Sequence, residues 1–197
     1  MSFVKDATAA RGLSCRMPQP LPGFESLAAT FEQPFEMLSA CHDRVRRSLQ
    51  LLVRLQDHLL AHGADDQARQ AAEDIVRYFG LAAPAHHEDE ERHVVPILQI
   101  ADDVKLRKAA QQMLQDHALI RSAWLELAPF LQQIGTGSAP QRTGFAEAVD
   151  RFVRLHDDHL RLEDELGFPE ARARHEAQGP AAIAAIGGEM ARRRRAR

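Results

Sequence analysis

The chain contains 197 residues with a formal net charge of −3, and 45% of its side chains are hydrophobic but only 6% aromatic. This length favours one domain with a sizeable core, and the abundance of Ala, Leu, Gln, Arg and Glu favours helix. Only two cysteines, no signal-peptide pattern and no run of roughly 20 apolar residues argue against a disulfide-rich secreted protein and a membrane-spanning one, so we expect a cytoplasmic protein.

Residues 1–33 are predicted to form an arm, because "MPQPLPGF" places three prolines within five positions and prevents regular helix. The first helix is predicted to start near Pro34 and to end at "HGADD", since its apolar residues recur every three or four positions. The second is predicted over residues 66–98. It should kink one turn before His86, where the ring of Pro84 would strike the carbonyl of Gly80.

Two further helices are predicted over residues 103–134 and 142–172, separated by "GTGSAP". Short connections between long amphipathic helices favour an all-α fold, an antiparallel up-down-up-down four-helix bundle over residues 34–172. The alanine-rich piece after "QGP" predicts a short helix within a C-terminal tail over residues 173–197. The basic run "ARRRRAR" is interpreted as solvated, so neither a nucleic acid nor a membrane is expected as a partner.

The inward apolar stripe of each predicted helix runs into a histidine. The steps 38, 42, 45 put His42 inside the first helix, and the steps 113, 117, 120 do the same for His117 on the third. The inward polar residues of the second and fourth helices are His86, Glu90, His156, His159 and Glu163. A single core histidine usually just finds a hydrogen-bond partner, so the pattern matters only if these residues meet.

The turns predict that four of these histidines lie at one height. His42 and His86 are 44 residues apart with their midpoint at residue 64, inside "HGADD". His117 and His159 are 42 apart with their midpoint at residue 138, inside "GTGSAP". Residues equidistant from the turn of an antiparallel hairpin share a level, because each helix rises about 1.5 Å per residue.

Two glutamates fit the same frame. The pairs His86–Glu90 and His159–Glu163 have the i,i+4 spacing that stacks two side chains on one helical face. The sequence also contains His87–Glu91, but a proline follows both Glu90 and Glu163 by six residues. That shared register selects the pair His86–Glu90.

Four buried imidazoles and two buried carboxylates predict a metal centre. A buried carboxylate is costly unless it is paired or bound to metal, and two divalent cations would neutralise both glutamates. Nitrogen and oxygen ligands with vacant positions suit non-haem iron, with manganese or zinc as competitors. Cys41 is interpreted as a core residue or a support for the ligands, with a catalytic thiol as the alternative.

These motifs resemble the hemerythrin-like, or HHE cation-binding, family. The resemblance covers about residues 34–172 and is carried by His42, "HHEDEERHVVP", "QDHALI" and "HLRLEDELGFP". It implies a four-helix bundle around two iron ions with an oxo or hydroxo bridge. The implied terminal ligands are His42, His86, His117 and His159, and the implied bridges are Glu90 and Glu163. In such a bundle His42 and His159 would serve one ion, and His86 and His117 the other.

The sequence departs from the oxygen-carrying members at two places. The residues one turn from His117 are Met113 and Arg121 rather than a further histidine, and the second bridge is Glu163 rather than an aspartate. A set of four histidines and two glutamates is similar to bacterial members implicated in repair of iron centres or in nitric oxide and oxygen responses.

The expected function is therefore metal binding at a di-iron centre that reacts with oxygen, nitric oxide or peroxide in sensing, storage or scavenging. A redox or iron-handling enzyme and a metal-free interaction domain are the alternatives, and catalytic residues and oligomeric state stay open. His156 is interpreted as a core histidine, a further ligand or a donor to a bridge. The histidines expected in solvent are His58, His62, His87, His93 and His175, and the expected acidic rim is Glu91, Asp164 and Glu165.

Overall fold

The computed structural model describes residues 30–195, so residues 1–29 of the predicted arm lie outside the described residues. Within this range the backbone forms helices and no strand, as the sequence predicts. The α-helices are α1 (Pro34–His62), α2 (Asp66–Arg77), α3 (Ala83–His93), α4 (Val95–Gln99), α5 (Val104–Gly135), α6 (Arg142–Leu162), α7 (Phe168–Ala177) and α8 (Pro180–Arg195). Two π-helical turns, η1 (Tyr78–Ala82) and η2 (Glu163–Gly167), join α2 to α3 and α6 to α7.

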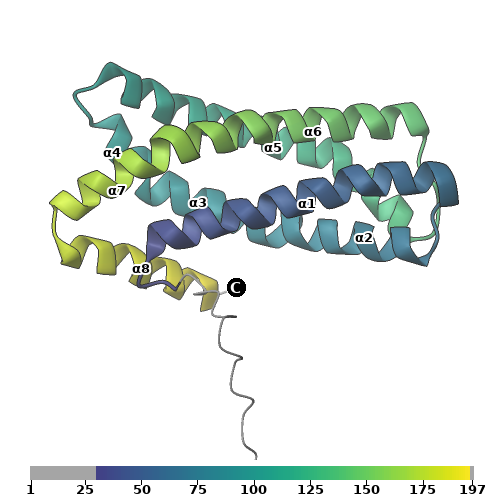
Figure 1. Cartoon of the computed structure of the whole chain (residues 1–197), viewed down its shortest axis with the longest axis horizontal. Coiled ribbons are helices and arrows are strands. Elements are labelled where there is room, and N and C mark those ends of the chain that lie inside the picture. Colours follow the sequence, from purple (N-terminus) through teal and green to yellow (C-terminus); the bar gives the residue numbers. More distant parts are fainter. Residues whose placement is uncertain (1–29, 196–197) are drawn as a thin grey trace, which may run out of the picture.

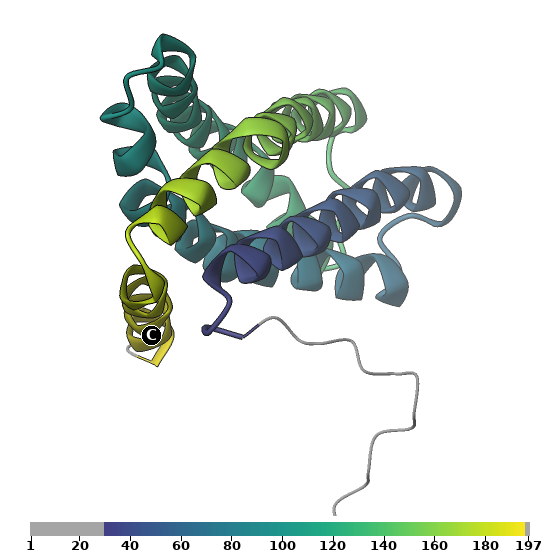
Figure 2. The ribbon, with the colours of Figure 1, turned by 60° about the vertical axis from the view of Figure 1, so that its left-hand side comes forward.

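Four helical arms lie side by side: α1, α2 with α3, α5, and α6 with α7 (Figure 1). Side chains cap the starts of three helices, since Asp65 accepts a hydrogen bond from Ala68 N and Gln141 accepts one from Gly144 N. Asp103 does the same at the start of α5. The last helix, α8, packs against α7, α1 and α3 at one end of the molecule (Figure 2).

A π turn lies at the position where a kink is expected before Pro84. The Ala83 N–H donates to the carbonyl of Tyr78, five residues back, just before the proline. The Phe168 N–H donates to the carbonyl of Glu163 in the same way before Pro169. Each widened turn accommodates a proline that lacks an N–H and would strike the carbonyl four residues back.

Two predicted helix boundaries were wrong. The helix expected over residues 66–98 breaks a second time at Val94, two residues before Pro96, and α4 starts at Val95. Pro96 has no N–H to donate to the carbonyl of Arg92, four residues back, and its ring crowds that carbonyl, which explains the interruption. The fourth arm continues through Ala177, beyond the predicted residue 172.

A polar layer divides the core into two apolar clusters. The first cluster includes Val45, Leu49, Leu52, Ile75, Phe79, Ala83, Ile120, Leu127, Leu131 and Phe152. The second includes Phe35, Leu38, Val94, Leu98, Met113, Phe168, Ile186 and Met190. On α1 the polar layer lies between Leu38 of the second cluster and Val45 of the first. On α5 it lies between Met113 and Ile120. The clusters therefore fix the height at which the inward histidines meet.

None of the helices within residues 30–195 combines the length and the hydropathy that a membrane crossing requires.

Candidate metal centre

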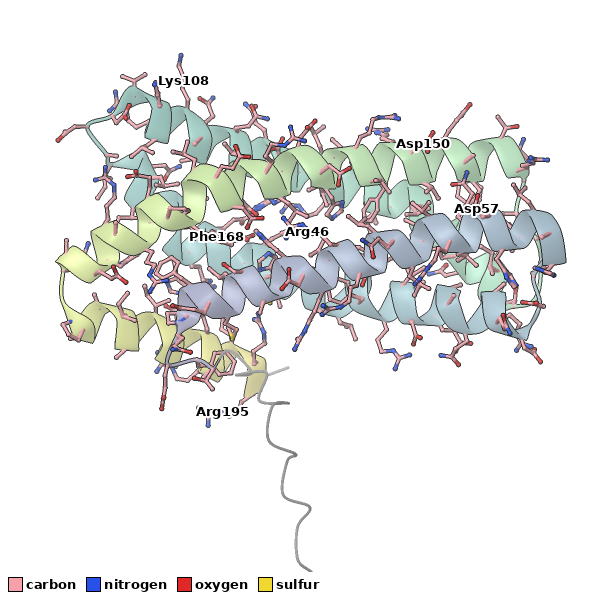
Figure 3. The ribbon with its side chains drawn as sticks, viewed as in Figure 1. Arg46, Asp57, Lys108, Asp150, Phe168 and Arg195 are labelled. Atoms are coloured by element: carbon pink, nitrogen blue, oxygen red, sulfur yellow. The ribbon has the colours of Figure 1, made fainter. Side chains whose placement is uncertain are left out.

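The six residues predicted as metal ligands converge in the polar layer. Their exposed fractions are 2% or less, and they are His42, His86, Glu90, His117, His159 and Glu163. They come from α1, α3, α5, α6 and the start of η2. Phe168 closes one side of the layer, with its ring stacked on His42 at a centroid distance of 4.7 Å (Phe168 is labelled in Figure 3).

The first group of candidate ligands lies between α1 and α3. It consists of His42, His86, Glu90 and Glu163, whose ligating atoms all lie within 4.8 Å of one another. The Nε2 atom of His86 is 2.9 Å from Glu90 Oε1, and the Nε2 atom of His42 is 3.1 Å from Glu163 Oε2.

The second group lies between α3, α5 and α6. It consists of His87, Glu90, His117 and His159, again within 4.8 Å. Glu90 belongs to both groups, because its Oε1 faces His86 while its Oε2 lies 3.4 Å from the Nε2 of His117. Glu163 also lies between the groups, since its Oε2 is 3.2 Å from the Nε2 of His159.

The predicted division of the histidines between two ions was wrong. The structure places His42 with His86 and His117 with His159, with ring centroids 5.0 Å and 4.8 Å apart. Each pair belongs to two helical arms that are consecutive in the chain, α1 with α3 and α5 with α6.

His87 was wrongly expected in solvent. Its exposed fraction is 7%, and its ring stacks on His117 at a centroid distance of 4.2 Å. Burial and the neighbouring His117 hold the pKa of His87 well below its usual value, so its lone pair is available to a cation. The π turn η1 explains the error, because its extra residue shifts the helical register by one position. Phe79 consequently shares a face with His87, eight residues on, and both line one cavity.

The other histidines divide between core and surface. His93 is buried, against expectation, and its carbonyl accepts a hydrogen bond of 2.8 Å from Nε2 of the half-buried His175. His62 is exposed and His58 is half-buried.

Carboxylates hold the outer nitrogens of two candidate ligands by hydrogen bonds. Asp164 lies 2.7 Å from the Nδ1 of His42, and Glu91 lies 2.9 Å from the Nδ1 of His117. Such a carboxylate accepts the Nδ1 proton and leaves the Nε2 lone pair free for a metal. Two members of the expected acidic rim thus support the centre, whereas Glu165 is exposed.

Asp116 is a supporting residue that the sequence analysis missed. It lies 3.8 Å from the Nδ1 of His159 and is 9% exposed. Its position one residue before His117 was available in the sequence, but its partner is on another helix.

Buried polar atoms without hydrogen-bond partners show that these residues fit a cation. The set contains both carboxylate oxygens of the two glutamates and the Nε2 atoms of His42, His86, His117 and His159. The contacts between these nitrogens and oxygens are close, but they are not aligned as hydrogen bonds. Buried polar groups are normally satisfied, so unpartnered lone pairs converging in one layer are typical of metal ligands.

The ionisation of the layer is strongly coupled. Burial lowers the pKa of His42, but contacts with Asp164, Glu163 and Glu90 outweigh burial and raise it to about 11. The same competition between burial and the glutamates raises the pKa of His117 to about 10 and that of His86 to about 9. Burial raises the pKa of Glu90, yet His86 and the other imidazoles hold it well below its usual range. Without a cation, protons on the imidazoles neutralise the glutamates.

His156 lies outside both groups of candidate ligands. Its Nδ1 donates to the carbonyl of Phe152 at 2.9 Å, so the neutral ring carries a lone pair on Nε2, and this buried atom lacks a hydrogen-bond partner among the described residues. Burial lowers its pKa to about 4. The hypothesis that His156 donates to a bridge fails, because in this tautomer Nε2 accepts hydrogen bonds.

Cys41 lies beside the first group. Burial raises the pKa of its thiol, but interaction with His86 outweighs burial and lowers it. The hydroxyl of Tyr78 donates to the Cys41 carbonyl at 3.3 Å. The half-buried Cys41 thus lies against the ligand-bearing face of α1, and its role as a core residue, a support for the ligands or a reactive thiol stays open.

Comparison with known proteins agrees with this geometry. The model of the hemerythrin HHE cation-binding domain matches residues 33–171. The chain belongs to this family. An uncharacterized protein of Haemophilus influenzae is 31% identical to this hemerythrin-like chain over 140 residues, which span 70% of this chain and 78% of that protein. The matched region contains all the candidate ligands, whereas α8 lies after it.

Cation binding is expected to release protons. A cation needs the Nε2 lone pairs of His42, His86 and His117, and below pH 9 these imidazoles are protonated in the metal-free protein. Affinity should therefore rise with pH from 6 to 8, with release of about three protons for each pair of cations, one from each of these imidazoles. Calorimetric titration with Zn²⁺ in buffers of different ionisation enthalpy measures this number, and binding without proton release would contradict it.

His87 and His156 are expected to behave differently on substitution. His87→Asn removes one imidazole from the second group and should lower the affinity for one of the two cations. Loss of a residue that only supports a ligand lowers metal affinity ~10–100-fold, and the loss here should be at least as large. His156→Asn removes a buried imidazole outside both groups and should leave two cations bound. Competition with a chromogenic chelator measures both affinities, and the reverse ranking would contradict this assignment.

Proposed function

We propose that this hemerythrin-like chain binds two non-haem iron ions, linked by an oxo or hydroxo bridge, and reacts with a small ligand. The observation that carries this proposal is the position of Glu90, whose two oxygens face two different groups of candidate ligands. A carboxylate placed in this way suits two cations better than one. Imidazole and carboxylate donors suit iron, and manganese and zinc are its competitors.

The two ions would have unequal surroundings. His42 and His86 would hold the first ion, and His87, His117 and His159 would hold the second, with Glu90 and Glu163 between them. The first ion would have one imidazole fewer than the second, which would leave a position for an exogenous ligand. Iron with an open position supplies reversible ligand binding or redox chemistry.

Oxygen, nitric oxide and peroxide are the proposed ligands because the cavity beside the second group is small. A cavity of about 120 Å³ lies between α3, α5 and α6, and Phe79, His87, Trp124 and Phe152 are among its lining residues. A water molecule takes up about 30 Å³ of liquid, so this space admits only small molecules. Aromatic rings form part of the lining, together with the charged groups of Glu91 and Arg121. Sensing, storage or scavenging in the cytoplasm would use such a centre.

A redox or iron-handling enzyme is the second candidate, and His156 favours it. Its neutral, unpartnered Nε2 can accept a proton or a hydrogen bond next to the centre. Sustained turnover of peroxide by the iron-loaded protein would select the enzyme over a reversible binder.

Loss of either glutamate is expected to disrupt the paired site. Glu90→Gln should reduce the bound iron from two to about one per chain or less, because amide oxygens carry no charge to balance the cations. Glu163→Gln should act similarly, whereas Glu165→Gln, on an exposed residue two positions away, should leave two ions bound. Metal analysis of protein loaded with Fe²⁺ measures the ratio. Less than one iron in the unaltered protein would favour a metal-free interaction domain.

Absorption spectroscopy is expected to report reversible ligand binding. Iron-loaded protein that is reduced without oxygen and then exposed to air should gain the near-ultraviolet bands of a bridged ferric pair. Removal of oxygen should restore the colourless state if binding is reversible. Bands that appear once and do not cycle would contradict reversible binding and support a sacrificial or catalytic role.

A further inference from the structure

Helix α8 makes a charged contact with the back of the candidate metal centre. Its buried residues Ile186 and Met190 join the second apolar cluster beside Phe35 and Leu38. Gly187 faces the carbonyl of Phe31 so closely that a Cβ atom would lie 1.7 Å from that oxygen. This packing places the last turn of α8, which ends at the labelled Arg195 in Figure 3, next to α3.

The contact centres on Asp89, which precedes Glu90 and has no exposed surface. Arg193 pairs with its Oδ1, and Nη2 of Arg194 lies 2.6 Å from its Oδ2. Arg194 also donates to the carbonyl of Ala85 at 3.3 Å. The sequence analysis wrongly interpreted these arginines as a solvated run, because their partner lies over 100 residues earlier in the chain.

Asp89 sits among the candidate ligands His86, His87 and Glu90 on an 11-residue helix. α3 is bounded by a π turn at one end and by the break at Val94 at the other, so it is a short helix between two irregular turns. Two guanidinium groups that hold Asp89 and the Ala85 carbonyl fix the rotation of this helix from outside. The rotation of α3 decides where its imidazoles and its glutamate point.

We propose that α8 is a clamp that retains the metal ions by holding α3 in its ligating orientation. Arg193 and Arg194 are positioning residues, and they act on the ions through Asp89. This inference rests on the proposed metal centre. It also assigns a role to a helix that lies outside the segment matched by the family model.

The test is the rate at which a chelator removes Co²⁺ from the full chain. Arg193→Gln with Arg194→Gln should release Co²⁺ at least about tenfold faster than the unaltered protein. Arg192→Gln with Arg195→Gln changes two exposed arginines of the same helix and should stay within about twofold. The d–d spectrum of bound Co²⁺ should also change in the first variant alone, which a change of stability by itself would not cause. Equal release rates in both double variants would overturn the clamp.

A third variant separates loss of the clamp from destabilisation by a buried charge. Arg193→Gln with Arg194→Gln leaves the Asp89 carboxylate buried without a counter-charge, which destabilises the fold. Adding Asp89→Asn removes that buried charge. The triple variant is neutral at this contact and should still release Co²⁺ rapidly, so release at the rate of the unaltered protein would overturn the proposal. Failure of the unaltered protein to bind Co²⁺ would instead refute the metal centre and the clamp with it.

Discussion

Two glutamates inside a helical bundle set the condition on which the rest of the structure depends. Neither Glu90 nor Glu163 has any exposed surface, and an unpaired carboxylate at such a position costs several kcal/mol. Imidazoles from the two other arms, His42 of α1 and His117 of α5, must therefore reach them, and this requires every arm to keep its height. The two apolar clusters provide that alignment, because they pack above and below the polar layer. The layer and the core consequently depend on each other.

Outside the polar layer, carboxylates contact the imidazoles and arginines contact those carboxylates. Asp164 holds His42 and is itself paired with Arg46, which lies on the same helix as His42 (Arg46 is labelled in Figure 3). Glu91 likewise holds His117 and contacts Arg121. Imidazole, carboxylate and guanidinium thus follow one another from the centre to the surface. Each outer group restricts the rotation of the group inside it, so the orientation of the candidate ligands does not depend on the cations alone.

The sequence predicted the helical class and the convergence of six residues because both depend on regular geometry. Helical periodicity marks the inward face, and the midpoint of each turn gives the height of residues such as His42 and His117. Neither rule gives the rotation of one helix relative to its neighbours, so the division of the histidines into groups was wrong. Contacts between residues distant in the chain, such as Arg193 with Asp89, leave no periodic signal at all.

The π turn η1 explains the most consequential of these errors. In a regular helix, seven residues return to nearly the same face, which aligns Phe79 with His86. The extra residue of the π turn makes the interval eight, so Phe79 aligns with His87 and Tyr78 aligns with His86. The contacts agree, since Tyr78 and His86 both interact with Cys41, while Phe79 and His87 line the same cavity. The π turn that accommodates Pro84 therefore orients His86 toward the first group of candidate ligands and His87 toward the second.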